Sequence, residues 1–249
     1  GNNDTITGSA GDDWIDAGLG SDTIDGSGGV DTISYASATA GVTVTLNGAN
    51  TQSDTLSNFE NLFGSDQGDI LTGDANNNVI EGGLGNDALD GAVGVDTVSY
   101  AYSAAAVSVN ISGSVVAGIA ANSATGGEGS DTMSNFENIT GSSYDDVLVG
   151  DGNANVIAGG NGNDLLIGGA GADTLSGGNG TDTVSYVNAL AGVTATINGT
   201  GSAGDANGDV LSSIENLIGS AFNDVLTGDG GNNVIDGGTG NDTIDAGAG

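Results

Sequence analysis

A nine-residue unit repeats along this chain and restricts its fold more than any other feature. Residues 159–185 read GGNGNDLLI, GGAGADTLS and GGNGTDTVS, with Gly at the first and fourth positions, Asp at the sixth and an aliphatic residue at the eighth. Fifteen such units run in four blocks, at residues 8–34, 64–99, 141–185 and 219–245. A repeat this short and regular indicates a solenoid of stacked coils.

The spacing within the unit predicts the shape of each coil. A three-residue strand around the eighth position can point one aliphatic side chain inward. The Gly-rich residues before it suit a tight turn, because glycine accepts positive φ and lets backbones approach closely. Two units then close one coil of 18 residues. Identical positions should stack 18 residues apart, so the aliphatic residues form a thin core and the sixth-position Asp residues line both edges.

The charge balance of the chain requires a cation from outside. The sequence has 33 acidic residues and no Lys, Arg, His, Cys or Pro, which gives a net charge of -33. Nucleic acid is excluded as a partner, because phosphate recognition needs Lys and Arg. No apolar run approaches the roughly 18 residues of a spanning helix, so membrane insertion is not expected. Carboxylates and turn carbonyls are ligands that calcium prefers, whereas zinc favours His and Cys and magnesium demands a stricter octahedron.

A second, longer repeat lies between the blocks. Three segments start alike at Ser34, Ser99 and Ser185, and each ends in a further unit at residues 49–57, 126–134 or 204–212 followed by an FENL-type stretch. What remains of each segment is an arm whose period-two alternation, as in VTVTL from residue 42, predicts half-buried strands. We interpret the arms as additional rungs of the solenoid. Surface hairpins packed on its side remain the alternative.

The units GGNGNDLLI, GGAGADTLS, GGNGTDTVS and GGTGNDTID resemble the calcium-binding nonapeptides of the RTX (hemolysin-type) family. The resemblance implies an all-β, right-handed parallel β-roll or β-solenoid with calcium held in the turns by loop carbonyls and the sixth-position Asp. It also implies a bacterial protein exported in one step and folded outside the cell. Residues 1–249 are expected to form one continuous array, with modules at about 1–33 (partial), 34–98, 99–184 and 185–249.

Transferred residue by residue, the resemblance implies several Ca²⁺ ions held by Asp and Gly residues of the units. The expected Asp ligands are Asp13, Asp22, Asp31, Asp69, Asp87, Asp96, Asp131, Asp146, Asp164, Asp173, Asp182, Asp224 and Asp242. The Gly residues whose turns supply further ligands are Gly82, Gly85, Gly159, Gly162, Gly168, Gly171, Gly177, Gly180, Gly237 and Gly240.

Pairs 18 residues apart should share ions. The pairs expected on one edge are Asp164 with Asp182, Asp146 with Asp164, Asp69 with Asp87, Asp224 with Asp242 and Asp13 with Asp31. On the opposite edge Asp173 and Asp96 face Asn155 and Asn78, and weaker sites are expected there because an amide brings no charge. The Asn units carry Asp at their second position, which either replaces the missing carboxylate or faces solvent in the turn.

Three recurring features are not explained by the pattern of the unit. The first turn of three blocks should depart from the pattern, because Gln67, Tyr144 and Phe222 replace the fourth-position Gly. The Glu-Asn pairs at 60–61, 137–138 and 215–216 are interpreted as solenoid corners, with Glu facing solvent or calcium, rather than as acid/base pairs. The tyrosines at 35, 100 and 186 are interpreted as plugs that end an apolar stack.

The residue types favour a structural protein over an enzyme. The chain has no His, Cys or Lys to act as a base or nucleophile. No pair of carboxylates stands apart from the repeat as a candidate for catalysis either. We expect a calcium-dependent folding segment of a secreted bacterial surface or matrix protein, such as an adhesin stalk, a surface layer or an extracellular filament that self-associates. The alternative is the C-terminal repeat domain of an RTX exoenzyme or toxin. The chain begins inside a repeat and without Met, so we expect it to be part of something longer.

Overall fold

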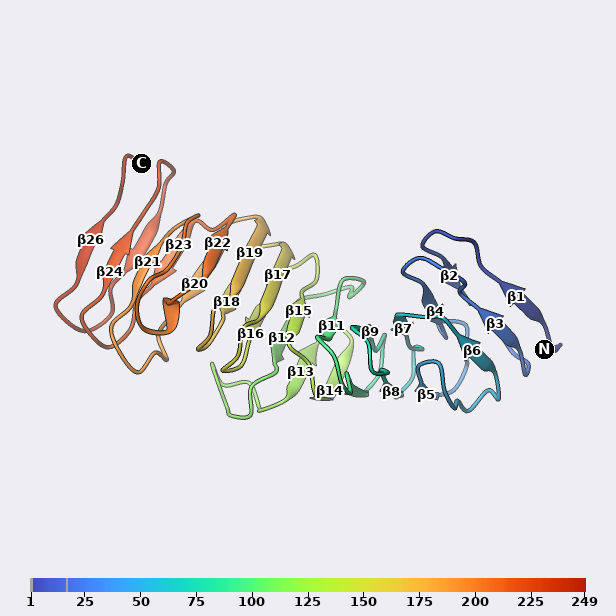
Figure 1. Ribbon diagram of the computed structural model, residues 1–249. Coiled ribbons are helices and arrows are strands. Elements are labelled where there is room, and N and C mark those ends of the chain that lie inside the picture. Colours follow the sequence, from blue (N-terminus) through green and yellow to red (C-terminus); the bar gives the residue numbers. More distant parts are fainter. Residues whose placement is uncertain (1, 17) are drawn as a thin grey trace. The chain divides into compact units, whose positions relative to one another are not determined.

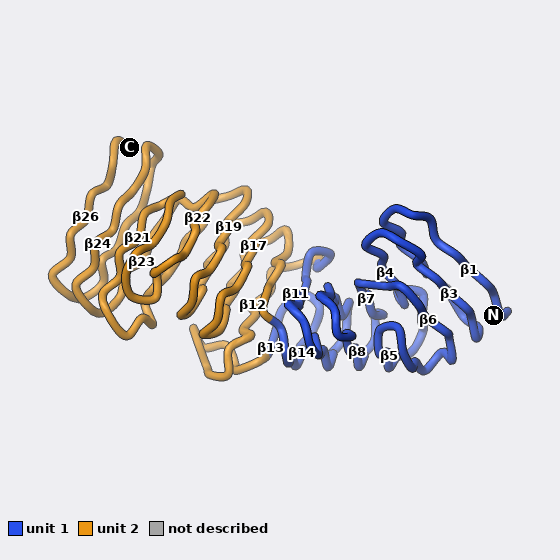
Figure 2. Tube along the Cα trace, in the orientation of Figure 1, with its two compact units in different colours: residues 1–103, 123–136 blue, residues 104–122, 137–249 orange. Residues whose placement is uncertain are grey.

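The computed structural model describes residues 2–16 and 18–249, which divide into two compact units. Unit 1 comprises residues 1–103 and 123–136, and unit 2 comprises residues 104–122 and 137–249 (Figure 2). Each unit is a stack of short strands joined by turns (Figure 1). The module boundaries expected from the sequence differ from this division and stay a prediction.

The strands of unit 1 form three groups of neighbours. One group holds β1 (Thr5–Thr7), β3 (Thr23–Asp25) and β6 (Thr55–Ser57). A second holds β2 (Trp14–Ile15), β4 (Thr32–Ser34), β7 (Asn61–Phe63), β9 (Val79–Glu81) and β11 (Thr97–Ser99). The third holds β5 (Thr43–Thr45), β8 (Ile70–Thr72), β10 (Ala88–Asp90), β14 (Gly129–Ser134) and β13 (Ser123–Gly126).

Unit 2 has the same organisation. One group of neighbours holds β12 (Val107–Asn110), β16 (Val147–Val149), β18 (Leu165–Ile167), β20 (Thr183–Ser185), β23 (Asn216–Ile218) and β25 (Val234–Asp236). A second holds β15 (Asn138–Thr140), β17 (Val156–Asn161), β19 (Thr174–Asn179) and β22 (Val210–Ser212). The third holds β21 (Thr194–Thr196), β24 (Val225–Thr227) and β26 (Thr243–Asp245).

The strand register follows the 18-residue coil. In unit 2, β16 pairs in parallel with β18 and β18 with β20, so Leu148, Leu166 and Val184 stack at the eighth position of successive coils. All three side chains are fully buried, with 0% of their surface exposed. A parallel ladder needs a crossover between paired strands, and here the intervening nine-residue unit supplies it as a strand of another sheet. The predicted all-β fold of parallel strands with an aliphatic core is confirmed.

The arms contribute rungs to this stack. Strand β5 pairs in parallel with β8, β12 with β16, and β21 with β24, each in register with a repeat unit. The alternating residues Val42, Val44 and Leu46 are buried, as predicted for a half-buried strand. Short antiparallel contacts follow the rung, such as the bridge between Val44 and Asn50. Each arm is therefore a rung that continues into a small hairpin.

The embedded units also take their predicted places. Strand β6 pairs with β3, β14 with β10, and β22 with β19, so that Leu56, Met133 and Leu211 stack on eighth-position residues. Within residues 2–16 and 18–249 the helical content is one 3₁₀ turn, η1 (Gly204–Ala206). No helix of that part of the chain is long and apolar enough to cross a bilayer.

Candidate metal sites

The sixth-position side chains stack along the edges of the coils, linked by a repeated hydrogen bond. The backbone N–H of Asp146 donates to Oδ1 of Asp164 at 2.9 Å, and that of Asp164 donates to Oδ1 of Asp182 at 2.8 Å. The same bond joins the other pairs expected from the sequence, which are Asp13–Asp31, Asp69–Asp87, Asn78–Asp96, Asn155–Asp173 and Asp224–Asp242. Each predicted pair is brought together.

The turns that carry these side chains are of two kinds. In the first kind, which we call Gly turns, the second residue of the unit has positive φ, as at Gly83 (84°), Gly160 (112°) and Gly178 (105°). Gly turns open the units that start at residues 17, 26, 82, 91, 159, 168, 177 and 237. Seven of these units start with glycine, where a Cβ would be crowded; at Gly159 it would lie less than 3 Å from Oδ2 of Asp164.

In six of the Gly turns one carboxylate oxygen has no hydrogen-bond donor. Oδ1 accepts the stacking N–H, but the buried Oδ2 atoms have no partner in Asp22, Asp31, Asp87, Asp164, Asp173 and Asp182. These side chains are at most 2% exposed. A buried charged oxygen without a partner costs several kcal/mol unless a cation compensates it. The chain encodes no cationic side chain, so these atoms fit a bound metal ion.

Electrostatics agree with this need for a cation. Burial raises the pKa of Asp164 to about 7, and the negative charges of Asp146 and Asp182 add to the effect. Burial likewise raises the pKa of Asp87 and of Asp173 to about 7, again with help from neighbouring carboxylates. In each case the ionised form is disfavoured without a positive charge nearby.

In the second kind of turn, which we call a capped turn, residues of the same unit donate hydrogen bonds to the side-chain oxygens of its sixth residue. The Ser142 N–H donates to Oδ2 of Asp146 at 2.5 Å, and the Ser142 hydroxyl donates to Oδ1 at 2.8 Å. The same Ser hydroxyl accepts the N–H of Tyr144, which stands where a Gly turn has glycine. Equivalent caps join Ser9 to Asp13, Ser65 to Asp69 and Ser220 to Asp224.

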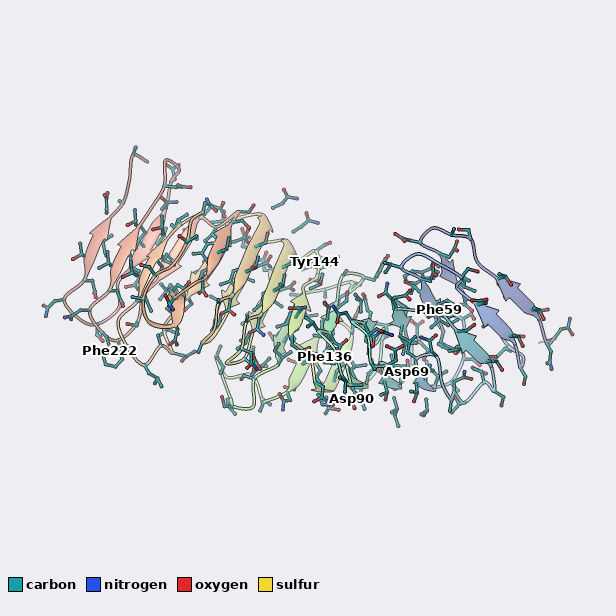
Figure 3. The ribbon with its side chains drawn as sticks, viewed as in Figure 1. Phe59, Asp69, Asp90, Phe136, Tyr144 and Phe222 are labelled. Atoms are coloured by element: carbon teal, nitrogen blue, oxygen red, sulfur yellow. The ribbon has the colours of Figure 1, made fainter. Side chains whose placement is uncertain are left out.

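The carboxylates of capped turns therefore do not require a metal. Asp13, Asp69, Asp146 and Asp224 were expected as ligands, but both oxygens of each accept hydrogen bonds from the chain itself. The expected departure of the first turn in the blocks with Gln67, Tyr144 and Phe222 is explained by this cap. Tyr144 and Phe222 are about half exposed on the outside of their turns (Figure 3).

The Asn units form capped turns as well. The N–H of Asp74 donates to Oδ1 of Asn78 at 2.7 Å, and Nδ2 of Asn78 donates to the carbonyl oxygen of Glu60 at 2.9 Å. Oδ1 of Asp74 accepts the N–H of Asn76, as in an Asx turn. The units with Asn155 and Asn233 repeat these contacts. Second-position Asp thus caps its own turn, and the contacts do not support the idea that it replaces a ligand.

In the embedded units a tyrosine hydroxyl donates the hydrogen bond that Oδ2 of the sixth-position Asp would otherwise lack. The hydroxyl of Tyr100 donates to Oδ2 of Asp131 at 2.9 Å, and that of Tyr186 donates to Oδ2 of Asp209 at 2.8 Å. Tyr35 bonds Asp54 in the same way at 3.4 Å. The tyrosines are buried, as expected for plugs, but their hydroxyls have a specific role. Asp131, an expected ligand, is satisfied by the chain through this bond.

The sequence analysis missed two carboxylates that occupy the sixth-position register. Oε2 of Glu60 accepts the N–H of Asp31 at 2.9 Å, and Oε2 of Glu215 accepts that of Asp182 at 2.8 Å. The signal was present, because each Glu stands two residues before a buried aliphatic residue, Leu62 or Leu217, which is the spacing of the sixth and eighth positions.

Capped turns occur at definite places. Ser-capped Asp69, Asp146 and Asp224 each accept the N–H of an arm residue through Oδ1, from Val42, Val107 and Val193 respectively. Asn-capped turns instead follow the Glu segments, through the Nδ2 bonds to carbonyl oxygens of Glu60, Glu137 and Glu215. A capped turn therefore stands where a column of turns follows an arm or a Glu segment, whereas the Gly turns of Asp31 and Asp182 lie on the other side of a Glu segment.

Asp164 and Asp182 lie in Gly turns that stack on each other, so this candidate site has two carboxylates with an unpaired oxygen. Among residues 2–16 and 18–249, no group of three acidic side chains lies close enough together to hold a metal unaided. The remaining ligands are expected from backbone carbonyls of the turns, since calcium binds carbonyl as well as carboxylate oxygens. The ten expected Gly residues, from Gly82 to Gly240, all occupy Gly turns.

The comparison with known families agrees with this geometry. The chain matches the RTX calcium-binding nonapeptide repeat at residues 1–33, 63–98, 134–166, 149–184 and 215–249. These matches cover more than half of the chain, which therefore belongs to this family of structural calcium-binding repeats. A search of curated proteins found no match. The chain binds Ca²⁺ through several of its repeats.

Acidification is expected to favour the folded state in calcium-free buffer. The folded pKa of Asp87, Asp164 and Asp173 is about 7, whereas the ordinary value is 3.8. The folded state therefore binds protons more tightly, and this stabilisation is complete below the ordinary pKa and lost as the pH rises through about 7. Far-UV circular dichroism should show strand signal increasing between about pH 8 and pH 4. A signal that falls on acidification over that range would contradict the assignment.

Proposed function

We propose that this chain is a calcium-driven folding segment of an extracellular bacterial surface or matrix protein. The observation that carries the proposal is the row of buried Oδ2 atoms without donors in the Gly turns, in a chain without any cationic side chain. Asp164 and Asp182 best represent the proposed ligands, because each lies in a Gly turn stacked on the other.

Calcium would act by compensating charge between coils. The ion neutralises the carboxylates, and the carbonyls of two stacked Gly turns complete its oxygen shell. Because the unfolded chain lacks this arrangement, the binding free energy becomes folding free energy. In the cytoplasm, where calcium is scarce, the acidic chain stays extended and suited to export. At the millimolar concentrations where extracellular modules bind calcium, it folds.

A structural role fits the residues better than a catalytic one. The chain offers no His, Cys or Lys, and the carboxylates of the Gly turns are proposed for calcium rather than for proton transfer. The arms, embedded units and Glu segments recur three times, and each time an arm N–H, a tyrosine hydroxyl and a Glu carbonyl make the same bonds to the repeats. Such a recurring module suits an extended load-bearing element such as an adhesin stalk, surface layer or filament.

A calcium titration followed by far-UV circular dichroism tests this function. We expect little strand signal at submicromolar free calcium and a cooperative gain with a midpoint on the order of 10⁻⁴–10⁻³ M, the range of extracellular calcium modules. Magnesium at the same concentrations should not replace calcium, because it keeps its water shell. A full strand signal in excess chelator at neutral pH would refute calcium-driven folding.

A further inference from the structure

Glu128 is a buried acidic residue that the nine-residue pattern does not explain. It occupies the third position of the embedded unit at residues 126–134, GGEGSDTMS. Only 6% of its surface is exposed, and its Oε2 atom has no hydrogen-bond partner. By contrast, the third position is exposed in all fifteen units of the four blocks. One of them, Asp66, also carries a carboxylate.

The turn that carries Glu128 stacks on a Gly turn. The N–H of Gly85 donates to the carbonyl oxygen of Glu128 at 2.6 Å, and the N–H of Asp87 donates to Oδ1 of Asp131 at 3.0 Å. Gly129 has positive φ (133°) as Gly85 does (146°), but Gly127 does not, so residues 126–129 form the tight turn between β13 and β14 rather than a Gly turn. Residues 128–131 therefore stack in register on residues 84–87 of a Gly turn, which places the third to sixth positions of the two units against each other.

Two carboxylate oxygens in this pair of turns lack donors. Oδ2 of Asp87 has none, and neither has Oε2 of Glu128. The other buried acids nearby are satisfied, since Glu81 accepts bonds from the Ser99 hydroxyl and the Tyr102 N–H, and Asp131 accepts one from the Tyr100 hydroxyl. Burial, followed by the charges of Glu81, Asp131 and Asp87, raises the pKa of Glu128 to about 8.

Placing a carboxylate among other carboxylates is unfavourable unless a cation lies between them. An ionised carboxylate buried without a donor costs several kcal/mol, and turning Glu128 outward, as Asp66 is turned, would avoid that cost. We propose that Glu128 ligates a calcium ion held between turns 82–87 and 126–131, with Asp87 as the second carboxylate. The inference rests on the proposed calcium binding by Gly turns and adds a ligand that the repeat pattern does not supply.

The added carboxylate changes the affinity of this one site. In a regular pair of turns the third residue offers only its carbonyl, whereas here its side chain brings a negative charge. Calcium affinity rises with the charge of the ligand set. The Glu128 site is therefore the tightest of the proposed sites and the first to be occupied as calcium rises.

Isothermal titration of the whole chain with calcium chloride tests the site. Glu128→Gln should weaken the tightest class of site on the order of 10- to 100-fold, the loss that follows disturbance of metal ligation, and leave the remaining sites unchanged. Asp87→Asn should weaken the same class. Asp66→Asn is the matched control, because it removes an exposed carboxylate at the same position of a unit, and it should leave the tight class intact.

A second variant, Glu128→Ala, removes both the carboxylate and its burial cost, so it covers the case in which Gln packs poorly. Loss of the tight class in both Glu128 variants, with wild-type strand signal at saturating calcium, supports the site. Retention of the tight class in either variant overturns it while calcium-driven folding stands. An absence of calcium binding by the unsubstituted chain overturns both.

Discussion

Replacing Asp164 and Asp182 together by Asn is expected to raise the free calcium concentration needed for folding by roughly 10- to 100-fold. Both carboxylates lie in stacked Gly turns and each keeps a buried Oδ2 without a donor. Asn retains an oxygen for the stacking N–H but removes the charge that calcium would neutralise. The midpoint of a calcium titration, followed by far-UV circular dichroism, measures the effect.

Asp146→Asn combined with Asp224→Asn is the matched control. It removes the same two charges from capped turns, where both carboxylate oxygens already accept hydrogen bonds from Ser142 or Ser220. Because Asn leaves an arm N–H, that of Val107 or Val193, short of an acceptor, the control must first reach the wild-type strand signal at saturating calcium. The control midpoint should move much less. Equal shifts in the two double variants would show that the kind of turn does not decide where calcium binds.

The substitution Gly162→Ala is expected to lower the midpoint of thermal unfolding in saturating calcium by roughly 5–10 °C. Gly162 has a φ of 118°, which L side chains rarely adopt. Its added Cβ would also lie less than 3 Å from main-chain atoms of Tyr144 and Asp145 in the neighbouring coil. Backbone strain of this kind costs about 1–3 kcal/mol, and the clash adds to it. Circular dichroism during heating provides the measurement.

Gly152→Ala controls for the loss of a glycine in the same block. Gly152 lies in a capped turn, its φ is outside the positive range, and a Cβ there would meet nothing within 4 Å. Its unfolding midpoint should stay close to that of the unsubstituted chain. A drop at Gly152 as large as that at Gly162 would mean that the Gly-turn backbone is not what makes glycine necessary.

The coil could be predicted from the sequence because its period follows from the residue types at two positions of each unit. An aliphatic residue every nine positions and an Asp two residues before it fixed the 18-residue register, including the embedded units with Asp54, Asp131 and Asp209. The period-two alternation of the arms likewise marked their strands. The right-handed sense of the coil stays a prediction.

The two kinds of turn could not be predicted from the unit alone. Ser9 and Ser27 both stand at the second position, and both units have glycine at the fourth, yet Ser9 caps Asp13 while Ser27 has a φ of 75° in a Gly turn. The difference comes from what stacks above and below, which is a property of the assembled coils. The sequence therefore did not reveal that Asp13, Asp69, Asp146 and Asp224, which were expected as ligands, lie in capped turns.

The same dependence on neighbours explains why the expected ranking of the two edges finds no support. Asp173 stacks on Asn155, so the sequence suggested a weaker site there. In the structure its Oδ2 is as buried and as free of donors as that of Asp164. Its pKa is also raised to about 7. Membership of a Gly turn, rather than the edge, distinguishes the candidate ligands.

The capped turns affect how the number of modules in such a chain can increase or decrease. Capped turns stand where a column of Gly turns starts beside an arm or a Glu segment, and Asp131 and Asp209, each bonded by a tyrosine, stand in the embedded units that follow Asp87 and Asp173. At those joints a duplicated or deleted module leaves each carboxylate with its hydrogen bonds, whereas Asp31 and Asp182, which stack on Glu60 and Glu215, keep an Oδ2 without a donor. The hydrogen bonds of the capped turns and of the tyrosines thus allow modules to be added to the array at these joints.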